Sequence, residues 1–360
     1  MGFPREAHQA DCARLHPPQL HLQLNPLTVD PFSHVLSGAL LARASADRRT
    51  ALPLRLRVAA GCGAALFPDI DVALRLVDTL TYLNLHQGIT HSLVMLPVWT
   101  FLLSALFAVF TNRRTADFFA PVALGLSIHV AGDLITAYGL QLFTPLSQQH
   151  FSLSWAFVID PVITLILATG ALLSWLRPDQ RSAAIGALVL VACYLGFLSQ
   201  QHREALLLAQ IRAATHDLSQ ASAWPQPLSP YHWKLVVSDE SHHQQAHVNL
   251  REHAPLPWPG LLGGVARAYG EKEWTELPRL TDEFSRQAWL RPEFSSFRQF
   301  AKLPRIYAIT HDGGQRCAWF VDMRFEVPTL GPSFRFGSCQ SLTHPQQWER
   351  IRARGRFWMD

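Results

Sequence analysis

Long apolar stretches that hold no charged residue, or a single aspartate, dominate the middle of the chain. A membrane span needs about 20 mostly apolar residues. Four stretches meet this requirement and predict full spans at residues 93–111, 119–139, 155–176 and 183–200. A large soluble helical core is the alternative. Soluble helices of this length carry a polar stripe, which these segments largely lack, so the pattern favours the membrane.

Two shorter apolar segments, at residues 31–42 and 58–70, come before the predicted spans and are rich in small residues. Each is short for a full span. They are expected to be tilted, re-entrant or packed inside the bundle, where irregular backbone is tolerated. The predicted fold is therefore an all-α transmembrane bundle of about four full spans plus two short apolar helices, occupying residues 29–200.

Charged residues, Trp and Pro return after residue 200. Residues 201–230 are expected to extend the last helix and then form a Pro-rich linker. Residues 231–360 are expected to form a small extramembrane α+β domain. Alternating, β-branched or aromatic segments predict its strands at 234–237, 246–250, 316–325 and 333–336, and residues 275–307 are predicted to be mainly helical. Cys317 and Cys339 lie in this domain, where a disulfide is allowed.

The first 28 residues lack the apolar region of a signal peptide and hold several prolines and histidines. Residues 29–34 resemble the start of a mature protein, and a valine codon can initiate translation. We therefore expect residues 1–28 to be a non-native or disordered extension.

Basic residues predict the orientation of the bundle. The loops at about 43–57, 112–114 and 177–181 are rich in arginine, whereas the loops at about 71–92 and 140–154 contain Arg75 alone. Because cytoplasmic loops carry the excess of Lys and Arg, the arginine-rich loops should be cytoplasmic. The protein is thus expected in a bacterial inner (plasma) membrane, with its C-terminal domain in the periplasm or outside the cell.

Composition narrows the function. Charged residues make up only 16% of the chain, and the net charge is +4. This charge is small for 360 residues, and no basic cluster is interleaved with aromatics, so no nucleic-acid partner is expected. The 17 histidines instead suggest metal binding or acid–base chemistry.

Ionisable groups inside an apolar bundle are costly and mark function. In the apolar half they are His34, Asp69, Asp71, His86, His91, His129, Asp133 and Asp160. His129 and Asp133 are spaced i, i+4 and share one helix face. With the orientation above, all eight groups fall on the outer side of the membrane. Taken singly, each has a structural interpretation, such as a helix cap or a buried hydrogen bond.

Mixed His and Asp ligands suit Zn²⁺, and also Mn²⁺ or Fe²⁺. We expect His34, Asp69, His86, His91, His129 and Asp133 to bind the metal. Asp71 and Asp160 are expected to act as catalytic carboxylates, as further ligands or as partners of the ligands. A metal with an open position activates water at neutral pH. The pattern therefore predicts a metal-dependent hydrolase at the outer membrane boundary.

The ordered set of motifs resembles the YdjM-type family of membrane-bound, predicted metal-dependent hydrolases. The matching motifs are Asp30-Pro31-Phe32-Ser33-His34, Pro68-Asp69-Ile70-Asp71, His86-Gln87-Gly88-Ile89-Thr90-His91-Ser92, His129-x3-Asp133-x2-Thr136, and Ile159-Asp160-Pro161. They cover about residues 29–200. The family usually has Arg where Gln87 stands, which removes the cation expected beside His86.

The family looks distantly related to zinc-dependent phospholipase C and to single-strand nucleases of the P1 type. This kinship implies a phosphoester substrate, such as a phospholipid head group. Two alternatives stay open: a non-catalytic membrane protein with a structural metal, and a transporter that uses the same groups as an ion path. No acidic residue lies in the inner half of a predicted span, which argues against an ion path.

Overall fold

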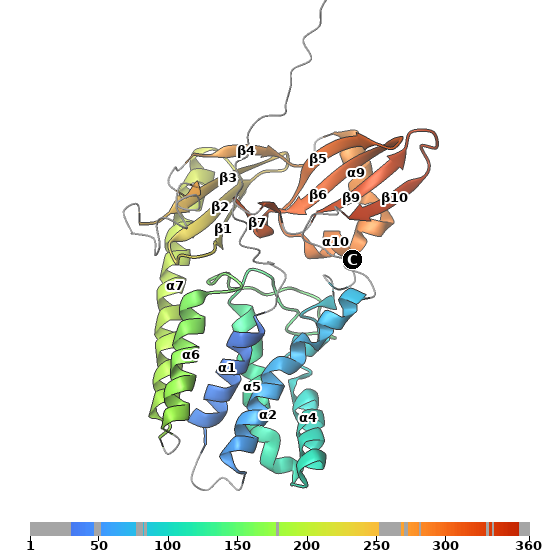
Figure 1. Ribbon diagram of the computed structural model, residues 1–360. Coiled ribbons are helices and arrows are strands. Elements are labelled where there is room, and N and C mark those ends of the chain that lie inside the picture. The colour runs from blue at the N-terminus through green and yellow to red at the C-terminus, as the bar shows by residue number, and fades with distance from the viewer. Residues whose placement is uncertain are drawn as a thin grey trace, which may run out of the picture.

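The computed structural model describes residues 30–46, 52–76, 82, 85–177, 180–251, 268–269, 273–280, 282–328, 331–332 and 335–352. The described chain forms a helical bundle with a β-rich domain over one end of it (Figure 1). The extension expected at residues 1–28 lies outside the described residues. We call the β-rich part, from residue 220 onward, the outer domain.

The described part of the bundle consists of α1 (Pro31–Ala44), α2 (Leu54–Leu66), α4 (Leu96–Thr111), α5 (Thr115–Leu134), α6 (Pro161–Leu176) and α7 (Ser182–Thr215). Two of these helices start with an aspartate N-cap. The Asp30 carboxylate accepts a hydrogen bond from the Ser33 N–H before α1, and Asp160 accepts from the backbone of α6. A proline follows each aspartate and suits the first helical turn, where no N–H partner is needed.

The prediction of four full spans is wrong. Among the described helices only α5, with 20 residues, and α7, with 34, are long and apolar enough to cross a membrane. Helices α4 and α6 have 16 residues each, because prolines in their first turns set late starts. Residues 93–95 and 155–160, which the apolar pattern assigns to spans, are turns and irregular chain.

Small residues bring α1, α2 and α5 into close contact. A Cβ atom on Gly38 would lie 2.6 Å from the Gly61 carbonyl oxygen, and a Cβ on Gly125 would lie 2.6 Å from the same oxygen. Only glycine fits such crossings, where backbones pack directly against each other. The short segments expected at 31–42 and 58–70 correspond to α1 and α2. Their small residues let them pack inside the bundle against α5.

The outer domain contains two four-stranded antiparallel sheets. The first has the order β1 (Gln220–Pro225), β2 (His232–Ser238), β3 (His242–Asn249), β4 (Thr275–Pro278). The second has the order β10 (Trp348–Arg352), β9 (Phe336–Ser341), β6 (Gln315–Asp322), β5 (Pro304–Asp312). A two-stranded ribbon, β7 (Glu326–Val327) with β8 (Gly331–Pro332), follows the short helix η4 (Met323–Phe325). The pairing of β6 with β9 carries the Cys317–Cys339 disulfide, as the sequence allowed.

The expected strands at 234–237 and 246–250 overlap β2 and β3, and the one at 316–325 overlaps β6. The prediction for residues 275–307 is only partly correct. Helices α9 (Glu283–Leu290) and α10 (Ser295–Phe300) fill its centre, but β4 and the start of β5 occupy its ends. Of the strand expected at 333–336, residues 333–334 lie outside the described residues, and Phe336 begins β9.

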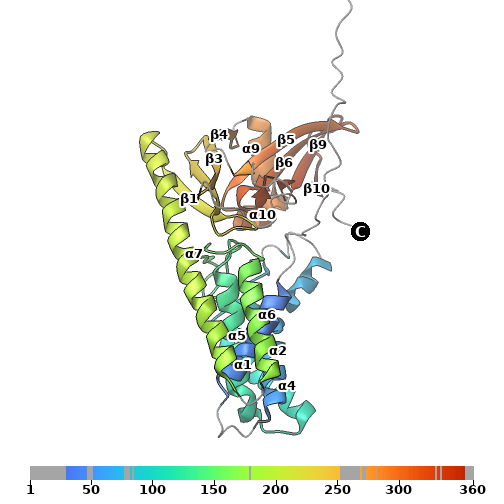
Figure 2. The same ribbon diagram turned by 60° about the vertical axis from the view of Figure 1, so that its left-hand side comes forward.

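Helix α7 joins the two parts of the molecule. It runs the length of the bundle and continues beside the first sheet (Figure 2). There Ala205, Ala209 and Ala213 pack against Trp233 and Leu235 of β2. Residues 201–230, expected to hold a helix extension and a linker, thus contain the end of α7, strand β1 and the turn into β2.

The outer domain also rests on the chain that follows α5. The Arg324 guanidinium donates to the Ala137 carbonyl oxygen at 3.0 Å and to that of Tyr138 at 2.9 Å. Arg324 is itself paired with the buried Asp322. Since Ala137 and Tyr138 lie four and five residues after Asp133, the outer domain contacts the end of the bundle where the ionisable groups gather.

Candidate metal centre

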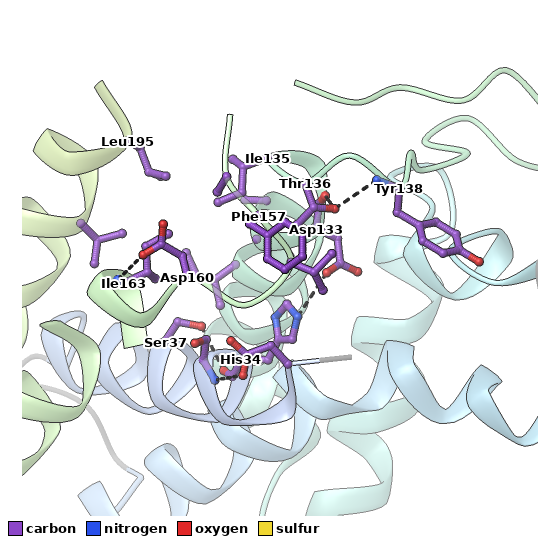
Figure 3. Close-up of a pocket in the computed structure, with 18 of the residues that line it drawn as sticks. His34, Ser37, Asp133, Ile135, Thr136, Tyr138, Phe157, Asp160, Ile163 and Leu195 are labelled. Atoms are coloured by element: carbon purple, nitrogen blue, oxygen red, sulfur yellow. Dashed lines mark hydrogen bonds and ion pairs between the residues drawn. The ribbon is translucent and has the colours of Figure 1, made fainter. Parts of the chain in front are cut away.

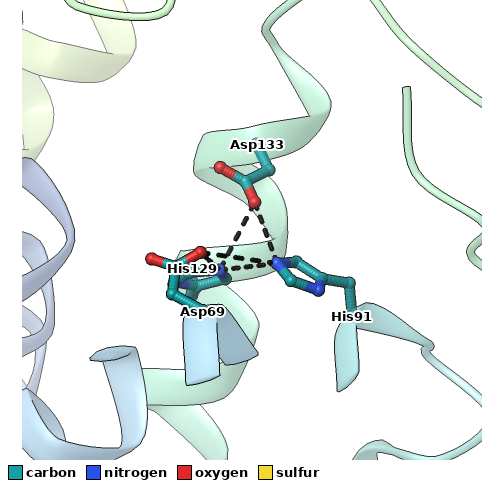
Figure 4. Close-up of side chains that lie close together, drawn as sticks. All are labelled: Asp69, His91, His129 and Asp133. Atoms are coloured by element: carbon teal, nitrogen blue, oxygen red, sulfur yellow. Dashed lines mark hydrogen bonds and ion pairs between the residues drawn. The ribbon is translucent and has the colours of Figure 1, made fainter. Parts of the chain in front are cut away.

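Four buried side chains from three separate segments meet near the end of the bundle that the outer domain contacts, and Figure 4 shows them pointing toward one another. Asp69 lies in η1 (Phe67–Leu76), just after α2, and His91 ends η2 (Ile89–His91). His129 and Asp133 lie one turn apart on α5, as their spacing predicts. One nitrogen or oxygen from each lies within 4.8 Å of all the others. We call these four residues the His/Asp cluster.

The polar atoms of the cluster converge closely. The Nε2 atoms of His91 and His129 are 3.0 Å apart, and Asp133 Oδ2 lies 3.1 Å from the former and 3.3 Å from the latter. Asp69 Oδ1 is 3.6 Å from His129 Nε2. Two imidazoles and two carboxylates are a donor set that Zn²⁺, Mn²⁺ and Fe²⁺ accept.

Asp69 supplies the test of whether a cation fits. Both of its carboxylate oxygens are buried, and neither has a hydrogen-bond partner among the described residues. An ionised carboxylate without partners is very costly to bury. A metal ion within the cluster would supply the missing interaction, so the donor set and the unpaired carboxylate both fit a bound cation.

Hydrogen bonds fix the tautomers of the two histidines. His129 Nδ1 lies 2.6 Å from the Ala65 carbonyl oxygen, which can only accept, so the proton is on Nδ1. Thr90 donates its hydroxyl to Asp71 and lies 2.9 Å from His91 Nδ1, which therefore donates to Thr90. In their neutral forms both rings would therefore present an Nε2 lone pair to the cluster, the arrangement that second-layer partners impose on metal ligands.

Asp71 stands behind the cluster. Its oxygens accept from His86 Nδ1 at 2.7 Å, from the Gln87 N–H at 3.1 Å and from the Thr90 hydroxyl at 3.0 Å. Burial raises the pKa of Asp71, but the hydrogen bond and charge of His86 outweigh it and leave the pKa below its ordinary value. The three donors hold Asp71 as a carboxylate that orients the residues around it.

His34 and His86, two of the expected ligands, lie beside the cluster. His34 Nε2 is 3.2 Å from Asp133 Oδ1, the oxygen that faces away from His91, and its ring lies 4.0 Å from that of His129. His86 pairs through Nδ1 with Asp71. The structure therefore brings six of the eight sequence-predicted groups into one cluster or direct contact with it, and His86 reaches it through Asp71.

Asp160 occupies a different position. One carboxylate oxygen caps α6, with Val162 N at 2.8 Å, and the other accepts from the Tyr194 hydroxyl at 3.2 Å. It lies across a cavity from His34 and Asp133 rather than in the cluster (Figure 3). A catalytic role for Asp71 or Asp160 stays a prediction.

Gln87 is a site residue that the sequence did not assign a role. Its side-chain N–H donates to Asp133 Oδ2 at 3.1 Å, the oxygen that also faces both histidines. The sequence did mark this position, because Gln87 stands where the YdjM-type family usually has Arg. A neutral donor here orients Asp133 without adding a positive charge beside a cation.

Aromatic side chains of both parts of the molecule enclose His86. The Tyr82 ring stacks on it at 4.6 Å, and Tyr138 meets it edge-on at 5.1 Å. Tyr138 in turn contacts Phe300 and Phe325 of the outer domain. The outer domain thus forms part of the wall around the ionisable groups.

A cavity of about 160 Å³ opens beside the cluster. His34 and Asp133 line one part of it, and Ile163 and Leu195 line another (Figure 3). Phe325 of the outer domain also lines it. A small molecule in this cavity would lie next to the ligands of a bound metal.

Comparison with known proteins places the bundle in a family. Residues 29–205 match the family model described as YdjM inner membrane protein. The uncharacterized protein YfhP of Bacillus subtilis (strain 168) is 27% identical over 176 residues, which are 48% of this chain and 52% of YfhP. The chain therefore spans about half the length of this curated relative. No solved structure matches the chain.

Proposed function

Residues 29–205 belong to the YdjM family of inner membrane proteins, and from this premise we propose that they form a membrane-bound, metal-dependent hydrolase of phosphoesters. The proposal rests on one observation: a buried cluster of two histidines and two aspartates borders a cavity, and the oxygens of one aspartate, Asp69, have no hydrogen-bond partner among the described residues. The family resemblance drawn from the sequence motifs is confirmed.

Asp69, His91, His129 and Asp133 would hold the metal, which we propose to be zinc. A bound divalent cation supplies Lewis acidity for attack on a phosphoester. The other residues of the site position the ligands. Ala65 and Thr90 fix the proton of each imidazole on Nδ1. Gln87 and His34 orient the Asp133 carboxylate. These contacts support pre-organised ligands beside a site for substrate.

Asp160 is the carboxylate we propose as proton acceptor. It faces the cavity from the wall opposite His34 and lies outside the cluster, so it stays free of the metal. Asp71, which bonds to His86 and to the Thr90 hydroxyl beside His91 and is not among the residues that line the cavity, is proposed as a positioning residue for these two histidines. A general base must reach the substrate, which the position of Asp160 allows.

The proposed orientation places the outer domain on the periplasmic side. At the opposite end of the bundle, Arg43 donates to the carbonyl oxygens of Arg177 and Gln180, and Arg181 donates to that of Ala46. The predicted cytoplasmic arginines thus gather at one end, as the positive-inside rule requires. The Cys317–Cys339 disulfide in the outer domain also suits an oxidising compartment.

The test combines metal content with hydrolysis. Protein purified in detergent is expected to hold divalent metal at near-stoichiometric amounts and to hydrolyse one of a panel of phosphomonoesters, phosphodiesters and phospholipids. His91→Ala should lose both properties, and the exposed His344→Ala should keep both. Metal binding without hydrolysis across the panel would favour the structural-metal alternative, which the complete burial of His91 and His129 also suits.

A further inference from the structure

The cavity beside the cluster has two chemically different parts. One part is polar and lies at His34 and Asp133 (Figure 3). The other part lies between α6 and α7 and is lined by aliphatic side chains: Ile163, Leu167, Leu188, Val191 and Leu195. The hydrolase proposal explains the polar part but gives no role to the aliphatic part.

The aliphatic residues form regular helical stripes. Ile163 and Leu167 are spaced i, i+4 on α6, and Leu188, Val191 and Leu195 are spaced i, i+3, i+7 on α7. Such spacing puts each set on one helix face. The two stripes therefore face each other across the cavity.

Helices α6 and α7 come into direct contact at the end of the cavity, next to Leu167 and Leu188. A Cβ atom on Gly170 of α6 would lie 2.3 Å from the Cβ of Ala187 on α7. This contact ends the space between the two helices, so the aliphatic part is a blind pocket continuous with the polar part. On their other faces α6 and α7 expose Leu165, Val189 and Leu190, as helices beside lipid do.

The polar groups along this part of the cavity are already satisfied. The Ser33 and Thr164 hydroxyls bond to each other at 2.9 Å, and Ser37 donates to the His34 carbonyl oxygen. Asp160 accepts from the α6 backbone and Tyr194 and, as a carboxylate, can take up a proton but has no hydrogen to donate to a ligand. A polar ligand would find few free partners there, and burying it unpaired is unfavourable.

The whole cavity holds about 160 Å³, and its aliphatic part is a share of that volume that suits the first few carbons of an alkyl chain. Apolar cavities of about 150 Å³ stay dry and take up an apolar molecule of about six carbons. We propose that the cavity holds the first carbons of the alkyl chain of an amphipathic substrate, with these carbons between α6 and α7 and the phosphoester at His34 and Asp133. The identity of the head group rests on the proposed function, whereas the chain site rests on the lining residues alone.

The test uses the full chain in digitonin, which has no flexible alkyl chain to occupy the pocket. The probe is hexadecyl phosphate with a diazirine in the chain, and labelled residues are mapped by mass spectrometry. Labels are expected on Ile163, Leu167, Leu188, Val191 and Leu195. Dodecyl phosphate should compete with the probe at a concentration at least tenfold lower than ethyl phosphate, because each buried methylene adds to affinity.

Matched variants locate the chain. Leu188→Trp fills the pocket and should reduce labelling at least tenfold, whereas Leu190→Trp, on the exposed face of the same helix, should stay within twofold of the unmodified protein. Metal content unchanged in both variants shows that the bundle is folded. If Leu188→Trp does not fold, the competition between ethyl and dodecyl phosphate on the unmodified protein still tests the chain site.

The outcomes separate the two proposals. Equal competition by ethyl and dodecyl phosphate, or labels spread over exposed residues such as Leu165 and Val189, would overturn the chain site. Labelling of the pocket without hydrolysis of any phosphoester would leave the chain site standing and remove the hydrolase. Hydrolysis at equal rates for ethyl and dodecyl esters, with no label in the pocket, would leave the hydrolase standing and remove the chain site.

Discussion

The Nε2 atoms of His91 and His129 lie 3.0 Å apart, although 38 residues separate the two histidines in the chain. Both rings are fully buried, and each carries its proton on Nδ1, bonded to Thr90 or to the Ala65 carbonyl. In neutral rings the two Nε2 lone pairs would repel each other, and either a bound cation or a proton on one Nε2 would relieve this repulsion. The pair is therefore an arrangement that fits the metal we propose for the cluster.

Removing either imidazole should empty the site. His129→Ala is expected to lower metal content at least tenfold, because a ligand is lost and a cavity is left next to Asp133. Elemental analysis of purified protein measures this. His344→Ala, an exposed histidine of the outer domain, is the matched control and should retain all its metal. Full metal content in His129→Ala would show that the cluster does not bind the ion.

Asp71→Asn should weaken the site without removing a ligand. The amide keeps the shape of the side chain but cannot accept from His86, Gln87 and Thr90 together, so His91 loses its orientation. Loss of a second-layer partner costs about 10- to 100-fold in metal affinity. Competition with a chelator measures the affinity.

Asp160→Asn is the comparison for this prediction. Asp160 makes no contact with the cluster and should leave metal affinity within twofold, while lowering the rate of hydrolysis if it accepts the proton. Equal loss of metal in both variants would contradict the separate roles assigned to the two carboxylates.

Four of the six ligands expected from the sequence gather in the His/Asp cluster, and their binding of a metal stays a prediction, whereas the helix lengths were predicted poorly. His129 and Asp133 could be paired from their spacing, and Asp69 and His91 from their place at the outer ends of apolar segments. Span lengths were overestimated because hydropathy counts the apolar residues 155–159, which lead into Asp160 and Pro161 without being helical. The late helix starts follow from proline, which the apolar count ignores.

The outer domain shows what sequence could not supply. Phe325 lines the cavity almost 200 residues after Asp133, and nothing in its local pattern marks it. Contacts of this kind depend on tertiary packing between parts that are distant in the chain. The strands of the outer domain, by contrast, could be predicted in part from local alternation.

Arg324 should hold the outer domain against the bundle. Its guanidinium bonds to the carbonyl oxygens of Ala137, Tyr138 and Phe300 and pairs with Asp322, which is fully buried. Arg324→Met leaves the Asp322 charge unpaired, which costs about 3–5 kcal/mol in the free energy of unfolding. It should also speed hydrogen exchange of the backbone at residues 135–140.

A second variant separates charge burial from docking. In Arg324→Met with Asp322→Leu, no charge is left unpaired, so much of the unfolding free energy should return. The fast exchange at residues 135–140 should persist, because the bonds to Ala137 and Tyr138 are still missing. Slow exchange in the double variant would show that Arg324 does not dock the outer domain.

Lys234 gives the outer domain a pH-dependent stability. Its side chain is fully buried, and its Nζ donates to the carbonyl oxygens of Met323, at 2.8 Å, and Glu326. Burial lowers the pKa of Lys234 to about 8, against the attraction of Glu326. Between this value and the ordinary lysine pKa of about 10.4, the unfolded chain binds a proton that the folded chain has lost.

The free energy of unfolding should therefore rise with pH in this window. At about 1.4 kcal/mol per pKa unit, the rise due to Lys234 is about 3 kcal/mol, complete near the unfolded pKa and absent below the folded one. Denaturant unfolding of the full chain, followed by tryptophan fluorescence, measures it. Lys234→Met lacks the titrating group, and Lys234→Arg keeps its charge throughout, so both variants should lose this part of the slope. An identical slope in the unmodified protein and in both variants would mean that Lys234 titrates alike in the folded and unfolded chain, and that its burial does not disfavour the charge.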